Sequence, residues 1–119
     1  MGLDIYPGGA QWSYTGFARF RKRLAAEEDI TLEAMRGFGG ALKWDSVRTS
    51  LAPLLNHSDC DGYLDPWDCE EMLPRLREIE AKWKAERAPV SGTYDVIQLG
   101  SLIAGFEHCV EHECAVSFR

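Results

Sequence analysis

A regular apolar stripe near the end of the chain restricts its fold more than any other pattern. The stripe consists of Val96, Leu99, Ile103, Phe106 and Val110, at alternating spacings of three and four residues. This spacing is the repeat of one helix face, so it predicts a long last helix, capped by Thr93 after a loop at Arg87–Gly92. Such a helix needs a core to cover its apolar face, which indicates a largely helical globular domain.

Two earlier segments carry helix signals of the same kind. Ser13 is placed to cap a helix from about residue 14 to residue 28, and Asp65 is placed to cap a long helix that starts at Pro66. The apolar positions are Phe17, Phe20 and Leu24 in the first helix and Cys69, Met72, Leu73, Leu76, Ile79 and Trp83 in the second. Pro74 is expected to kink the second helix.

The strand signals lie at the two ends of the chain. Leu3–Tyr6 alternates apolar and polar residues and precedes the turn residues Pro7-Gly8-Gly9. Ala115–Phe118 is the natural partner strand. We therefore expect an α+β fold, with residues 1–119 forming a mostly helical single domain and the N- and C-terminal strands forming a small sheet.

The charge is unevenly distributed. The chain has 119 residues, the size of one domain, and a net charge of −6. Residues 1–48 hold seven bases and six acids, net +1, whereas residues 49–119 hold six bases and thirteen acids, net −7. General DNA binding requires a broad basic face, so this class of function is excluded. An anion pocket in the first half and a cation site in the second half both stay open.

The first residues and the cysteines indicate the compartment. Met1–Pro7 has neither a basic nor an apolar signal region, and the apolar runs are too short to span a membrane, so we expect a cytoplasmic protein. Four cysteines without a C-x-x-C pair are expected to be reduced there, and a disulfide between Cys60 and Cys69 is the alternative.

The central loop contains the most informative motif. Counted from His57, the stretch His57-Ser58-Asp59-Cys60-Asp61-Gly62-Tyr63-Leu64-Asp65-Pro66-Trp67-Asp68 resembles an EF-hand loop. The candidate ligands for calcium or magnesium are Asp59, Asp61, the carbonyl of Tyr63, Asp65 and Asp68. Carboxylate and carbonyl oxygens are the ligands that these cations prefer.

Two features weaken the EF-hand interpretation. His57 replaces the expected acid, and imidazole is a poor calcium ligand, while Asp68 is shorter than the usual glutamate. One alternative is that Asp59 and Asp61 shape a tight turn in which Gly62 has a positive φ. Another is a pocket in which His57 and the two aspartates bind a different ligand.

Two enzyme motifs also occur in the sequence. His57-x-Asp59-x-Asp61-Gly62 resembles a signature of Asp-His-His phosphoesterases, but the second motif and the larger scaffold of those enzymes are missing. His108-Cys109-Val110-Glu111-His112 has the H-x-x-E-H pattern of inverted zincins, without room for a downstream third ligand. The histidines fall opposite the apolar stripe, which favours a solvated face over a zinc site. The motif at His57–Gly62 leaves a metal-dependent phosphoesterase, which would use the same acids, as the third functional option.

Aromatic and basic residues alternate in residues 12–23. Aromatic rings stack on nucleobases, and arginines match phosphates, so this segment is a candidate pocket for an anionic, nucleotide-like ligand. The candidate ligand-binding residues are Trp12, Ser13, Tyr14, Arg19, Arg23, His57, Asp59 and Asp61. The alternative is that Phe17 and Phe20 belong to the core and the bases form a solvated face.

Three blocks of sequence resemble an uncharacterised family of small phage, prophage and bacterial proteins. They are Met1-Gly2-Leu3-Asp4, the Trp12–Arg21 block, and Leu54–Gly62 with its His-Ser-Asp-Cys-Asp-Gly motif. The resemblance implies no catalytic residues. It implies a phage-type accessory protein in the cytoplasm of a bacterial host cell, and such proteins are often inhibitors of host defence.

The sequence therefore predicts a non-enzymatic counter-defence protein that binds a small anionic ligand or a host defence protein. A homo-oligomer is a further option. The alternative function is a single EF-hand-like module for a divalent cation.

Overall fold

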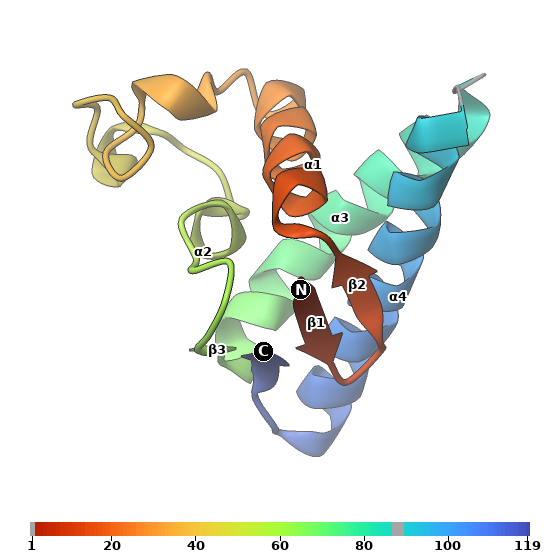
Figure 1. Ribbon diagram of the computed structural model, residues 1–119. Coiled ribbons are helices and arrows are strands. Elements are labelled where there is room, and N and C mark those ends of the chain that lie inside the picture. Colours follow the sequence, from red (N-terminus) through yellow and green to blue (C-terminus); the bar gives the residue numbers. More distant parts are fainter. Residues whose placement is uncertain (1, 87–89) are drawn as a thin grey trace.

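The sheet brings the two ends of the chain together. In the computed structural model, which describes residues 2–86 and 90–119, four strands form an antiparallel sheet in the order β2-β1-β4-β3 (Figure 1). The strands are β1 (Leu3–Tyr6), β2 (Ala10–Trp12), β3 (Tyr63–Leu64) and β4 (Val116–Phe118). Ile5 lies opposite Phe118 in the β1–β4 pair, and Leu64 lies opposite Val116 in the β3–β4 pair. The predicted pairing of the terminal strands and the α+β fold class are confirmed.

Helices make up most of the structure. They are α1 (Tyr14–Glu27), α2 (Ala52–Leu55), α3 (Pro66–Ala85) and α4 (Val90–His112), with short 3-10 turns η1 (Leu32–Ala34) and η2 (Trp44–Ser46). The predicted caps at Ser13 and Asp65 are confirmed: Ser13 Oγ accepts from the Gly16 N–H at 2.9 Å, and Asp65 Oδ1 accepts from the Asp68 N–H at 3.0 Å. Each bond satisfies an N–H group that the first turn of a helix leaves without a partner.

The start of the last helix differs from the prediction. Helix α4 begins at Val90, so Thr93 lies inside the helix and is not its N-cap residue. Part of the predicted loop, residues 87–89, lies outside the described residues. The physical reason is in the sequence: a proline at position 89 favours a helix start near itself, which overrides the capping signal of Thr93.

The predicted turn Pro7-Gly8-Gly9 is the loop of the β1–β2 hairpin, and it lies directly on α4. Gly8 has a φ of +104°, and a side chain there would collide with the carbonyl of Ser101. A side chain at Gly105 would likewise collide with the carbonyl of Pro7. Both positions therefore require glycine because two backbones approach each other closely.

The core lies between the sheet and the helices. Figure 1 shows α3 and α4 side by side behind the sheet, and no helix of the described residues covers its other face. The inner face of the sheet and the predicted helical stripes contribute to one cluster, which includes Leu3, Ile5, Phe17, Phe20, Leu24, Leu76, Trp83, Leu99, Phe106 and Phe118. Trp83 is the largest of the fully buried side chains. One face of the sheet thus belongs to the core, and the side chains on the other face are exposed except that of Ser117.

Candidate functional site

The predicted loop forms a compact turn closed by a serine. Ser58 Oγ accepts from the N–H groups of Cys60 and Asp61 at 3.2 and 3.4 Å. Gly62 has the predicted positive φ, +94°, and a Cβ there would lie only 3.2 Å from the ring of His57. The turn is thus shaped by Ser58 and Gly62, and the imidazole occupies the space that the glycine leaves.

His57 has both ring nitrogens close to backbone carbonyls. Nδ1 lies 2.9 Å from the oxygen of Ser58, and Nε2 lies 3.0 Å from the oxygen of Tyr63. The ring also packs on Phe118 of β4, with the two centroids 4.0 Å apart. The carbonyl of Tyr63 on edge strand β3 is therefore within hydrogen-bond distance of the imidazole. This contact and the packing on Phe118 attach the loop to the sheet.

A buried arginine fixes the start of this loop. Arg21 of α1 donates from Nη1 to the carbonyls of Leu55 and His57, at the end of α2. Its guanidinium lies between the rings of Phe17 and Phe38, at 4.8 and 5.0 Å from their centroids. Burial lowers the pKa of Arg21, and the nearby carboxylate of Asp59 acts in the opposite direction. Asp59 is thus part of the electrostatic environment of Arg21.

The acidic side chains of the loop do not converge. Among the described residues, no group of three or more His, Cys, Asp or Glu side chains is placed to hold a metal ion. The carbonyl of Tyr63 is occupied by His57, and Asp65 caps α3. Partial burial raises the pKa of Asp68, and the neighbouring carboxylates of Asp65 and Glu71 raise it further. Of the residues expected to bind calcium or magnesium, Tyr63 and Asp65 thus have structural partners, and Asp68 has acidic neighbours.

The aromatic and basic residues of the first helix are also distributed differently from the prediction. Trp12 is buried: its ring stacks on Phe20 at 4.4 Å, and its Nε1 donates to Asp95 at 3.3 Å. Arg23 lies 3.9 Å above the ring of Trp83 and forms ion pairs with Glu86 and Asp95. Both residues therefore take part in the packing of α1 and β2 against α3 and α4.

The other predicted residues of this segment have simpler surroundings. Ser13 is the helix cap described above, and Tyr14 and Arg19 are exposed on α1. His108 and His112 are exposed on α4, as predicted, with their ring centroids 4.3 Å apart.

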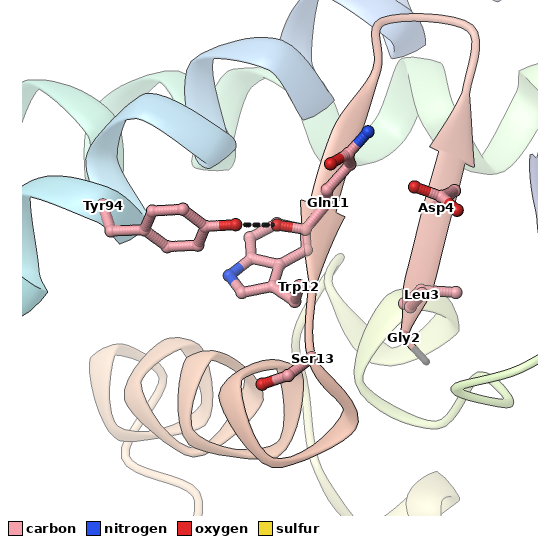
Figure 2. Close-up of a pocket in the computed structure, with 7 residues that line it drawn as sticks. All are labelled: Gly2, Leu3, Asp4, Gln11, Trp12, Ser13 and Tyr94. Carbon is pink, nitrogen blue, oxygen red and sulfur yellow. Dashed lines mark hydrogen bonds between the residues drawn. The ribbon is translucent and has the colours of Figure 1, made fainter.

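A small open hollow lies where β1, β2 and α4 meet. It has a volume of about 300 Å³ and is lined by Gly2, Leu3, Asp4, Gln11, Trp12, Ser13 and Tyr94 (Figure 2). This volume is at the lower end of the range for small-molecule sites. Asp4 is the one charged residue among these seven, so the electrostatics disfavour an anion. Trp12 and Ser13 of the predicted ligand residues line this hollow, and none of the seven belongs to the His57 loop, residues 57–62.

The same region shows how edge strand β2 is covered. Tyr94 Oη donates to the carbonyl of Gln11 at 2.6 Å, as Figure 2 shows, and the Gln11 N–H donates to Gln98 Oε1 at 2.7 Å. Side chains of α4 thus satisfy the outward-facing backbone groups of β2, and this protects the edge from pairing with another chain.

The open face of the sheet presents two exposed tyrosines. Tyr6 and Tyr63 lie on either side of Ser117 in the strand register, and they are 61% and 70% exposed. Arg119 lies over the ring of Tyr6 at 5.2 Å and donates from Nε to Ser117 Oγ at 3.2 Å. We call Tyr6, Tyr63, Ser117 and Arg119 the tyrosine face. Paired residues share one side of a sheet, so these side chains form one surface.

Sequence reasoning missed three of the residues that shape this region. Tyr6 falls on the outward side of the Leu3–Tyr6 alternation, which was the available signal. Arg21 is four residues after Phe17 and so lies on the buried face of α1. Arg119 gave no local signal, because the ring that it covers belongs to Tyr6, which is far away in sequence.

The wider comparisons add no relative. In the described part of the chain, no helix is long and apolar enough to cross a membrane. Comparison with protein-family models, curated proteins and solved structures finds no match to this chain.

Proposed function

We propose that this chain is a non-enzymatic accessory protein that binds another protein through its tyrosine face. The observation that carries the proposal is the exposure of Tyr6 and Tyr63 on a sheet face that no helix of the described residues covers. Tyrosine, tryptophan and arginine are the residues that contribute most to protein–protein affinity when a partner buries them. The clustering of Tyr6, Tyr63 and Arg119 around Ser117 is typical of an interface.

The charge beside this face indicates the kind of partner. From Asp59 to Glu71 the sequence has six acids and no base, and this segment includes Tyr63 and the 78% exposed Trp67. Exposed aromatic rings among carboxylates complement a basic protein surface, whereas they repel nucleic acid. The sequence resemblance to phage and prophage proteins is the reason for proposing a protein of the bacterial host.

The small-ligand alternative has less support. Trp12 is in the core, Arg23 is engaged in ion pairs, and the hollow in Figure 2 is lined by the carboxylate of Asp4. Of the two predicted kinds of partner, a host protein therefore fits the geometry better than an anionic nucleotide.

The test is affinity capture from a bacterial lysate with the wild type, a Tyr63→Ala variant and a Tyr14→Ala control. The control removes another exposed tyrosine, on α1 and outside the face. The affinity of a captured partner is then measured with purified proteins. We expect Tyr63→Ala to weaken binding by about tenfold or more, and Tyr14→Ala to leave it unchanged. Binding should also weaken as salt is added, because charge steers the association.

Two results would overturn the proposal. One is a partner that binds the wild type and the folded Tyr63→Ala variant equally well. The other is the absence of any captured protein together with a nucleotide that co-purifies in native mass spectrometry. Melting temperatures of all three chains show whether each variant is folded.

A further inference from the structure

The end of α4 brings two cysteines together through its backbone geometry. Glu113 has a left-handed φ of +53°, and the Cys114 N–H donates to the carbonyl of Cys109 at 3.0 Å. This is the bond of a Schellman motif, in which the residue after the left-handed position returns to the last helical turn. The motif brings the side chains at these two positions into contact, and here both of them are cysteines.

The sulfur atoms already point at each other. The Sγ atoms of Cys109 and Cys114 lie 2.7 Å apart, and a disulfide bond is about 2.05 Å long. The other two cysteines have different surroundings, since Cys60 is exposed on the His57 loop and Cys69 is buried in α3. We infer that Cys109 and Cys114 are an oxidation site, at which the chain forms an intramolecular disulfide.

The two thiols have different roles in the reaction. Cys114 is partly exposed and Cys109 is buried, and burial raises the pKa of Cys109 to about 12. Cys114 is therefore the sulfur that a soluble oxidant reaches first, while Cys109 stays protonated until the second step.

A small disulfide such as oxidised glutathione can serve as the oxidant that accepts the two electrons. The Cys114 thiolate attacks one sulfur of the oxidant, the bond between the two glutathione sulfurs breaks, and one glutathione thiolate leaves. Cys109 then gives up its proton to water and attacks the sulfur of Cys114, so the second glutathione thiolate leaves. The chain loses two protons and two electrons, and the oxidant becomes two glutathione molecules.

The new bond would lie next to the tyrosine face. Strand β4 begins at Val116, two residues after Cys114, and carries Ser117 and Arg119 into that face. A disulfide would therefore fix the turn that leads into β4, one of the two inner strands of the sheet. The inference concerns the oxidation chemistry itself and does not rest on the proposed function.

The experiment exposes fully reduced protein to oxidised glutathione, counts thiols after denaturation and maps the link by peptide mass spectrometry. We expect the wild type to fall from four free thiols to two, with a link between Cys109 and Cys114 and a higher melting temperature. A Cys60→Ser variant should form the same link. A Cys114→Ser variant should form no intramolecular link, and its melting temperature should not rise with oxidant.

The inference is overturned if the wild type keeps all four thiols, carries only glutathione adducts, or links Cys60 or Cys69 instead. Because Cys60→Ser changes only an exposed loop residue, it is expected to fold and keeps the test decisive even if Cys114→Ser does not.

Discussion

The ends of α1 and α4 have the same backbone motif with different side chains. At the end of α1, Asp29 has a φ of +56° and the Ile30 N–H donates to the carbonyl of Ala25 at 2.9 Å. At the end of α4, Glu113 takes the place of Asp29, and Cys109 and Cys114 take the places of Ala25 and Ile30. The contact at the end of α1 joins two apolar side chains and is ordinary packing. The contact at the end of α4 joins two thiols, which can react to form a covalent bond.

The two helix ends also lead to different places. After α1 the chain enters the short turn η1, and after α4 it enters β4, between β1 and β3. A change at the second end therefore acts on the middle of the sheet and on the tyrosine face.

The largest expected effect is the loss of apolar packing at the end of α1. Ile30 is buried, so Ile30→Ala should lower the free energy of unfolding by about 2–4 kcal/mol. Cys114→Ala in reduced protein should cost about 1 kcal/mol or less, because a smaller and partly exposed group is removed. Denaturant unfolding of both variants measures the difference, and equal losses would show that the two contacts are alike.

Oxidation should bring the loss caused by Cys114→Ala close to the loss caused by Ile30→Ala. A disulfide that closes the short loop from Cys109 to Cys114 should raise the free energy of unfolding by about 2 kcal/mol, since it restricts the unfolded chain.

The cysteine pair can also be transferred to the other helix end. A double variant with Ala25→Cys and Ile30→Cys should become oxidisable at the end of α1. Thiol counting on the Cys109→Ala background checks this, and a transferred pair that stays reduced would contradict the idea that the motif positions the sulfurs.

Alkaline pH should also separate the two ends, because Cys109 at the end of α4 can lose a proton, whereas Ala25 and Ile30 at the end of α1 cannot. Burial raises the pKa of Cys69 and of Cys109 from 9.0 to about 12. The unfolded chain therefore loses these protons first, and stability should fall as pH rises from 9.0 towards 12, by at most about 1.4 kcal/mol per pH unit for each thiol. Oxidation removes the thiol of Cys109, so the free energy of unfolding should decrease less steeply with pH in the oxidised protein. Identical slopes would mean that Cys109 does not titrate in this way.

The smallest expected effect concerns the left-handed residues. Glycine adopts this conformation without steric cost, so Glu113→Gly should raise the free energy of unfolding by about 0.5–1 kcal/mol. Asp29→Gly should gain less, because aspartate tolerates the left-handed region better than glutamate does. Chemical denaturation resolves the order of the two gains. A larger gain at Asp29 would point to strain at the end of α1.

Local signals were sufficient for much of the fold. The caps at Ser13 and Asp65 depend on residues next to them in sequence, and the helical stripes depend on spacing alone. Strands β2 and β3 have three and two residues, which is too short for a visible alternation. They exist because β1 and β4 supply partners from elsewhere in the chain.

The candidate site was harder to predict for the same reason. The contacts of His57 with Phe118 and of Arg21 with the loop join segments that are far apart in sequence. Trp12 was interpreted as a stacking residue because it lies outside the helical stripes. It is in fact on the inner side of β2, and that strand was not predicted.

The position of β4 has a consequence for how the protein is made. Strands β1 and β3 do not pair with each other, and β4 joins them. The sheet therefore cannot be completed until residues 116–118 have left the ribosome, long after β1 and β3. The inner surface of β1 therefore stays incompletely covered until residues 116–118 have been synthesised, and uncovered apolar surface is prone to aggregation. Closure of the sheet thus follows the synthesis of α3 and α4, and a pause in translation before residue 116 should lower the yield of folded protein.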